Sequence, residues 1–354
     1  MIVKTVLGEV DEKSLGIIAP HEHILLNAWS VILSKDKDIM PEIKEVTRKN
    51  LFNQRVSISN LGKLKINPLA VLDNVILSDV DLAIEEILEF KKFGGDTIVD
   101  QTNENMGRDP ISLKNISRAT ELNIITATGH YIEANQPDYV AKKREIELAQ
   151  IMVKEIGEGI DDTGIRAGVI GEIGVSKGIL PNEKKVLRAS AIAQKETGVA
   201  LSVHTWPFGT DGIEVLNILE KAGANLEKVI ICHVDGQINL KYCKELLSRG
   251  VFIEFDHFGK EYREISDGKL FIIPNDLERI ELIYKLINLN EDYINKILLS
   301  TDRCLKMELV KYGGFGYAHI LKNIIPYMRM YDFSEEQIDT LISKNPKNAI
   351  SIRK

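Results

Sequence analysis

The segment Lys228-Val229-Ile230-Ile231-Cys232-His233 shows most clearly the pattern from which the fold can be inferred. Its consecutive apolar residues suit a parallel strand that is covered by helices on both faces, and the run ends at a histidine. Seven further short apolar runs also predict strands, at residues 15–19, 97–101, 123–128, 167–173, 200–204, 251–255 and 296–300.

Helical patterns lie between these runs. Residues 81–90 and 183–197 place apolar side chains at helical spacing, and each segment is followed by glycine, which is a common helix stop signal. Ser334 and Gln337 form a capping box, in which each side chain satisfies a free backbone donor of the other residue. The capping box predicts a short closing helix that ends before Asn345-Pro346.

Strands that alternate with helices are typical of a barrel or of a doubly wound open sheet. The barrel is favoured because the polar residues of interest fall at the carboxyl ends of strands, and a closed barrel directs those ends to one mouth. We therefore predict an α/β protein with a (β/α)8 TIM barrel, as a single domain over residues 1–354. Residues 30–79 are expected to form an insertion of short elements after the first strand, and residues 266–275 a loop over the mouth.

The composition narrows the function. Of the 354 residues, 44% are hydrophobic and 27% are charged, as in soluble globular proteins. A net charge of -7 argues against a nucleic-acid partner. No apolar run is long enough to span a bilayer and the first residues lack the build of a signal peptide, so we expect no membrane partner and a cytoplasmic location. The cysteines Cys232, Cys243 and Cys304 lack paired spacing, so we expect small buried thiols and no disulfide framework.

Two histidines follow the first predicted strand, in the segment Pro20-His21-Glu22-His23. Side chains two residues apart at a strand end point to the same side, so both imidazoles should face the barrel interior while Glu22 faces away. Two neutral imidazoles can together hold one divalent ion, although a hydrogen-bonded buried histidine is the alternative at each position. Further candidate ligands end the fourth, fifth, sixth and eighth predicted strands: Glu172, His204, His233 and Asp302.

Five of the seven histidines, including His257, lie at predicted strand ends, which random placement rarely produces. Imidazole and carboxylate ligands suit zinc, manganese, cobalt or iron, and the sequence does not choose between them. Glu172 is the natural bridge between two ions, which would also share a hydroxide nucleophile. Asp302 would bind one ion and accept a proton that His257 passes to Asp235. The alternatives are a substrate contact or a core position for His257 and a plain loop role for Asp235.

With these residues in place, the chain resembles the phosphotriesterase family of the amidohydrolase superfamily. The resemblance covers nearly the whole chain and rests on Pro20-His21-Glu22-His23, Gly95-Asp96-Thr97-Ile98-Val99-Asp100, Gly107-Arg108-Asp109-Pro110, Gly198-Val199-Ala200-Leu201-Ser202-Val203-His204-Thr205 and Asn345-Pro346. It implies a barrel with a two-metal site, often zinc, and frequently a homodimer. Many members carry a carboxylated lysine as the bridging ligand, whereas this chain resembles a branch that uses glutamate, here Glu172.

The resemblance also implies a small-molecule substrate: an organophosphate triester, an acyl-homoserine lactone or a phosphorylated sugar lactone. Residues 313–321 and 128–131 look most like the sugar-lactone members. Lys260, Arg263 and Arg303 follow the seventh and eighth strands, where a guanidinium can clamp a phosphate. Tyr131 and Tyr262 are candidates for holding sugar hydroxyls. Ordinary solvated charges and core packing are the alternatives for these five residues.

These observations predict a metal-dependent lactonase that opens a five-membered sugar lactone bearing a phosphate. The rivals on the same site are an organophosphate triesterase and an acyl-homoserine lactonase. A rival of another class is a metal-containing protein that binds a sugar phosphate without turning it over.

Overall fold

The computed structural model describes residues 1–28, 50–266 and 269–352. Its main sheet has eight parallel strands, which follow the chain around the sheet from β3 to β14. The sheet is nearly closed, because the segment after β14 lies against β3: Asp302 N donates to His21 O at 3.1 Å, and Ser300 Oγ donates to the same carbonyl at 2.7 Å. The strands are β3 (Ile17–Glu22), β6 (Gly95–Asp100), β7 (Asn123–Thr128), β8 (Val169–Gly174), β9 (Ala200–His204), β10 (Val229–Ile231), β11 (Phe252–Phe255) and β14 (Ile297–Leu299).

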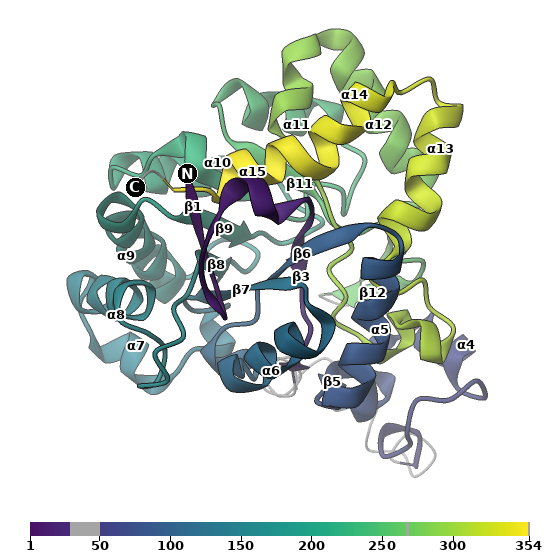
Figure 1. The fold of residues 1–354 in the computed structure, drawn as a ribbon, viewed down its shortest axis with the longest axis horizontal. Coiled ribbons are helices and arrows are strands. Elements are labelled where there is room, and N and C mark those ends of the chain that lie inside the picture. The colour runs from purple at the N-terminus through teal and green to yellow at the C-terminus, as the bar shows by residue number, and fades with distance from the viewer. Residues whose placement is uncertain (29–49, 267–268, 353–354) are drawn as a thin grey trace.

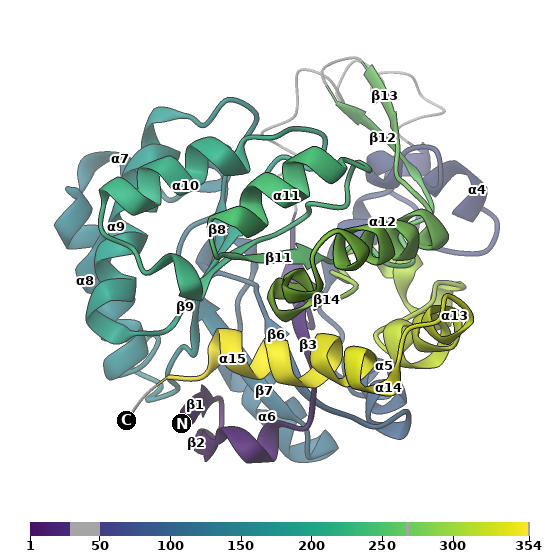
Figure 2. The same ribbon diagram turned by 90° about the horizontal axis from the view of Figure 1, so that it is seen from above.

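Helices surround this sheet, as Figures 1 and 2 show, so the predicted (β/α)8 barrel is confirmed. Side-chain caps mark where helices begin: Asp79 accepts from Leu82 N, and Asp109 accepts from Ser112 N ahead of Pro110. None of the described helices is long and apolar enough to span a bilayer. The helices are α5 (Val80–Lys92), α6 (Pro110–Thr120), α7 (Asp138–Lys142), α8 (Glu145–Gly157), α9 (Pro181–Thr197), α10 (Gly212–Lys221), α11 (Leu240–Ser248), α12 (Asp276–Leu289), α13 (Ile325–Met330), α14 (Glu335–Asp339) and α15 (Asn345–Ile350).

The amino-terminal end of the barrel is closed by both ends of the chain. The hairpin of β1 (Ile2–Thr5) and β2 (Gly8–Asp11) bridges to the carboxyl-terminal segment where Ile2 pairs with Ile352. Val3 is buried there in a cluster with residues from β3, β6, β7 and β8. This end of the barrel is therefore packed, and polar chemistry is left to the opposite end.

The insertion and the predicted mouth loop are only partly as expected. Residues 50–79 include short elements such as α4 (Leu61–Leu64) and β5 (Ile76–Leu77), as predicted, while residues 29–49 lie outside the described residues. The prediction of a loop at residues 266–275 is wrong, because β12 (Arg263–Ser266) and β13 (Lys269–Ile272) pair as an antiparallel hairpin. Aromatic packing anchors this hairpin, since Phe271 stacks on Phe208 with ring centroids 4.2 Å apart.

The closing helix also differs from the prediction, because it continues past Asn345-Pro346 into α15. A wide turn at Thr340–Lys344 precedes the proline, and such turns accommodate an interrupted hydrogen-bond ladder. The Asn345 side chain donates to the carbonyls of Ile294 and Ile297 at 2.7 and 2.8 Å. The Asn-Pro pair therefore ties the helix to β14 instead of ending it.

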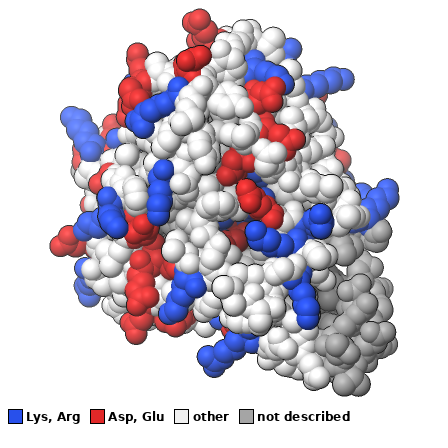
Figure 3. Space-filling model, turned by 90° about the vertical axis from the view of Figure 1, so that its right-hand side faces the viewer, with Lys and Arg blue, Asp and Glu red and all other residues white. Residues whose placement is uncertain are grey.

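The surface carries both signs of charge. Figure 3 shows lysine and arginine side chains interspersed with aspartate and glutamate over the displayed face. This distribution agrees with the modest net charge of the chain.

Candidate metal centre

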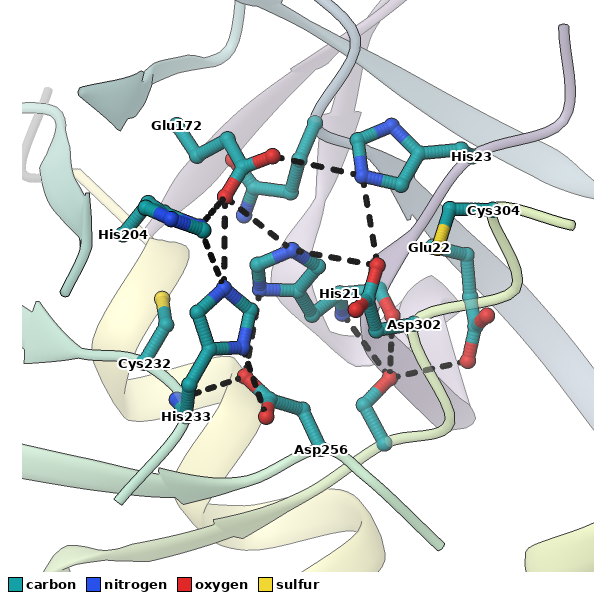
Figure 4. Close-up of polar contacts among 12 residues, drawn as sticks. His21, Glu22, His23, Glu172, His204, Cys232, His233, Asp256, Asp302 and Cys304 are labelled. Carbon is teal, nitrogen blue, oxygen red and sulfur yellow. Dashed lines mark hydrogen bonds and ion pairs between the residues drawn. The ribbon is translucent and has the colours of Figure 1, made fainter. Parts of the chain in front are cut away.

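Glu172, near the end of β8, lies between two pairs of imidazoles (Figure 4). Its Oε1 atom is 3.4 Å from His23 Nε2, on the side of β3. Its Oε2 atom is 3.2 Å from His204 Nδ1 and 3.5 Å from His233 Nε2, on the side of β9 and β10. One carboxylate thus faces both pairs, which is the arrangement required of a bridging ligand.

Asp302 follows β14 and completes the set on the side of β3. Its Oδ1 atom is 3.3 Å from His23 Nε2 and 3.8 Å from His21 Nε2. His21, His23 and Asp302 therefore form one group of donors, while His204 and His233 form the other. His204 is half-buried and the other candidate ligands are buried.

The donors fit a pair of divalent ions. His21 Nε2 and Glu172 Oε2 are buried and have no hydrogen-bond partner within the described part of the chain. His204 Nδ1 and His233 Nε2 are within hydrogen-bond distance of each other at 2.7 Å, and together with Glu172 they form a group of close donor atoms that could hold an ion. Buried polar atoms are normally satisfied, and imidazole nitrogens with carboxylate oxygens are the usual ligands of zinc and related ions.

The electrostatics of the ligands agree with this fit. Burial lowers the pKa of His21, but the hydrogen bond to Glu254 and the charge of Glu172 outweigh burial and raise it to about 9. For His23, burial is likewise outweighed by Asp302 and Glu172, which raise its pKa to about 10. These buried carboxylates would also attract a divalent cation, which takes the place of the ring protons because a metal-binding imidazole is neutral.

Two buried carboxylates, Glu254 and Asp256, contact His21 and His233, and they were not identified from the sequence. Glu254 Oε2 lies 3.1 Å from His21 Nδ1 and accepts from Cys232 Sγ at 3.3 Å. Asp256 accepts from the backbone N–H of His233 and contacts its Nδ1 at 2.9 Å. The signal was present, because Glu254 and Asp256 are carboxylates two residues apart at the end of an apolar strand, and both are fully buried. Cys232 is buried, as expected, and its thiol donates to Glu254.

Glu254→Gln is expected to weaken the binding of a divalent ion, with zinc as the probe, about 10–100-fold, as is typical when an outer-shell partner of a metal-binding histidine is lost. A carboxylate can only accept hydrogen bonds, so Glu254 favours the proton on His21 Nδ1 and leaves Nε2 as the metal-binding atom, whereas an amide can also donate and would not fix this tautomer. Equilibrium titration of the apoprotein with zinc against a competing chelator measures the change. Glu86→Gln is the matched control, because Glu86 is a buried carboxylate that accepts from Val310 N and Lys311 N. An unchanged zinc affinity in Glu254→Gln would show that Glu254 does not orient His21.

His257 lies between Asp302 and Asp235. The His257 ring stacks on that of His233 with centroids 4.9 Å apart. Its Nε2 atom is 3.9 Å from Asp302 Oδ2, and its Nδ1 atom is 3.6 Å from Asp235 Oδ1. Arg279, which is fully buried, holds the other oxygen of Asp235 at 2.7 Å. The structure thus brings together the three groups that the sequence suggested as a proton path.

The five residues suggested for substrate binding lie in different surroundings. Tyr131 Oη lies 3.3 Å from both ring nitrogens of His204, so it is beside the metal centre. Tyr262 is half-buried and packs against a cluster formed largely by the insertion, and Arg263 is exposed on β12. Arg303 does not suit the phosphate clamp that we expected, because it is fully buried and donates to the carbonyls of Phe258 and Gly316. Lys260 is also buried, and it bonds to Asp302.

The fold and the site define a class. A (β/α)8 barrel with four imidazoles and two carboxylates at the carboxyl ends of its strands is a metal-dependent hydrolase of ester or amide bonds. Residues 1–350 match the model of the phosphotriesterase family, and the chain belongs to that family.

Known relatives span the whole chain. An N-acetyltaurine hydrolase of Dictyostelium discoideum is 36% identical, over 99% of this chain and 98% of that protein. A resiniferatoxin-binding protein from Rhodobacter sphaeroides shares the structure with a TM-score of 0.92 and 33% identity, over 99% of this chain and 96% of the other. A mutant of a Deinococcus radiodurans PTE-like lactonase gives a TM-score of 0.74 and 28% identity, over 99% of this chain and 100% of the other.

Proposed function

We propose that this protein hydrolyses the amide bond of a small N-acyl amine that carries one negative charge, with N-acetyltaurine as the first candidate substrate. Relatives named N-acetyltaurine hydrolase support the proposal, because they align over nearly the full length of both chains at 31% to 36% identity. The observation that carries it is that the side chains of Lys260 and Arg303 point into the protein. Their N–H groups donate to backbone carbonyls of the chain itself. These two cations are therefore not placed to bind the phosphate of a sugar lactone, which was the role expected from the sequence.

Lys177 offers a cation suited to a single negative charge. It is exposed in the loop after β8, and its ammonium lies 4.9 Å from the centre of the Trp206 ring, which follows β9. Both residues lie at the carboxyl ends of their strands, as the metal ligands do. A sulfonate can be held by one ammonium, whereas a phosphate dianion favours a bidentate guanidinium.

Two divalent ions, for which we propose zinc, would be held by His21, His23, Glu172, His204, His233 and Asp302, and when bound they supply an activated water and polarise the substrate carbonyl. The protein supplies the proton transfers. Asp302 Oδ2 accepts a proton from the attacking water and returns it to the departing nitrogen. An amide requires this return, because an unprotonated amine is a very poor leaving group. His257, which faces Asp302 on one side and Asp235 on the other, takes up the second proton of the attacking water from Asp302.

Opening of a lactone, including the phosphorylated sugar lactone favoured by the sequence, is the second candidate. It uses the same carbonyl chemistry, and a relative at 28% identity is titled a PTE-like lactonase. Tyr131, beside His204, supports it as a hydroxyl that can bond to a sugar.

A substrate panel tests the proposal. The zinc-loaded protein is assayed with N-acetyltaurine, N-ethylacetamide, phosphorylated and unphosphorylated pentonolactones, an acyl-homoserine lactone and a phosphotriester. We expect the highest kcat/KM for N-acetyltaurine, and a lower value for N-ethylacetamide, which has the same amide but no sulfonate. A preference for a phosphorylated lactone would overturn the amide proposal and restore the lactone. Absence of turnover on every compound would favour a binding protein.

A further inference from the structure

Lys260 is a buried cation in the loop that follows β11, and it is only 2% exposed. Its Nζ atom donates to Asp302 O at 2.6 Å, contacts Asp302 Oδ2 at 3.0 Å and contacts Glu308 Oε1 at 3.2 Å. An ammonium group has three N–H donors, and these three oxygens can accept all of them. No donor of Lys260 is then left for the anionic group of a substrate.

The contact with Lys260 distinguishes the two carboxylate oxygens of Asp302, because each oxygen faces different groups. Oδ2 is held by the ammonium and also faces His257 Nε2 at 3.9 Å. Oδ1 consequently points to His23 and His21, at 3.3 and 3.8 Å from their Nε2 atoms. An aspartate without this contact would be freer to rotate about its side-chain bonds. The ammonium therefore fixes which oxygen faces the metal ligands and which faces the proton path.

Lys260 is itself held by a hydrogen-bonded turn that carries Glu308. Glu308 accepts from Lys260 through Oε1, and from Cys304 N and Leu305 N through Oε2 at 3.0 Å each. The loop after β11 is pressed against the same region, because a Cβ on Gly259 would lie 2.6 Å from a guanidinium nitrogen of Arg303. The lysine thus lies between two tightly connected loops, which makes it a precise anchor for Asp302.

We infer that Lys260 is a positioning residue, which sets the Asp302 carboxylate for metal binding and proton transfer and does not bind substrate. The inference rests on the hydrolase class of the protein and not on the amide substrate proposed above. It also differs from the expectation drawn from the sequence, in which Lys260 was a cation for a substrate phosphate.

The test combines Lys260→Met with Lys260→Arg and a matched control. Lys306→Met is the control, because Lys306 lies in the loop that carries Asp302 and pairs with Asp73. Zinc affinity is measured by titrating each apoprotein with zinc against a competing chelator, a readout that needs no substrate. Values of kcat and KM are then compared on a charged and a neutral substrate of the same reaction. Lys260→Gln replaces the methionine variant if thermal unfolding shows that the latter is not folded.

We expect Lys260→Met to bind zinc about 10–100-fold more weakly, as for other outer-shell groups. Its kcat should fall roughly 10²-fold on both substrates, because a misplaced catalytic group has an effect of that size, while KM changes little. Lys260→Arg should restore part of both values, and Lys306→Met should match the wild type.

Two results would overturn the inference. A selective rise in KM for the charged substrate, with normal zinc affinity, would make Lys260 a substrate contact. Wild-type zinc affinity and kcat in Lys260→Met would show that the contact with Asp302 has no part in the reaction. If no substrate is found, the zinc titration alone decides about Lys260, so failure of the proposed function is distinguishable from failure of this inference.

Discussion

Asp302→Asn is expected to lower kcat by about 10²–10⁴-fold, the range typical of a lost general base, while substrate affinity stays nearly unchanged. An asparagine amide has the shape of the carboxylate but cannot accept and return a proton at Oδ2, the oxygen that faces His257. Measurement of kcat, KM and bound zinc on the metal-saturated variant checks the expectation, because four imidazoles and Glu172 would remain as proposed ligands.

The change to asparagine should preserve the backbone. Asp302 adopts a positive φ of 44°, a conformation that asparagine tolerates better than alanine does. Asp332→Asn is the matched control, since Asp332 also has a positive φ, of 63°, and lies outside the metal centre. If Asp302→Asn kept most of the wild-type kcat with a full complement of zinc, another group would have to carry the proton. A non-catalytic binding protein would show equal ligand affinity in both forms and turnover in neither.

Much of the fold could be predicted because its strands are local patterns of apolar residues. The predicted bounds of β7 and β9 match those observed, and the fold class is confirmed. The first strand was predicted at residues 15–19 but spans Ile17–Glu22, because its polar end is paired rather than exposed. Glu22 accepts from Ser300 Oγ and from the N–H and hydroxyl of Thr301, which are distant in sequence. The hydropathy of neighbouring residues cannot predict hydrogen-bond donors that are so distant in the sequence.

The candidate site, like the fold, could be predicted only where it depends on local sequence and not where it depends on distant partners. The proposed ligands could be named because each one lies near the carboxyl end of a strand or just beyond it, and a barrel brings these strand ends together. The roles of the surrounding charges could not be predicted, because they depend on the direction of each side chain. Lys260 and Arg303 both lie in loops at the mouth, yet both point inward to protein acceptors. Sequence position therefore predicted where the cations lie but not what they bind.

Glu172→Gln is expected to reduce the bound zinc from two ions per chain to one or none and to abolish turnover. The glutamine keeps the shape of the side chain, but its amide nitrogen cannot act as a metal ligand and only one oxygen is left. Glu172 faces His23 through one oxygen and His204 and His233 through the other, so both halves of the site lose their shared anion. The effect should exceed the about 10–100-fold loss that is typical of outer-shell changes.

Zinc content after dialysis and the zinc-dependent rise in Tm measure this loss, because a ligand that binds the folded state stabilises it by mass action. Glu183→Gln is the control: Glu183 is fully buried and accepts from Glu133 N, Ser176 N and Leu180 N, so its change should lower stability without changing zinc content. Two zinc ions at wild-type affinity in Glu172→Gln would show that no bridging carboxylate is needed. Loss of both ions in Glu172→Gln, with normal zinc content in Glu183→Gln, would instead tie the two-metal site to the single carboxylate at the end of β8.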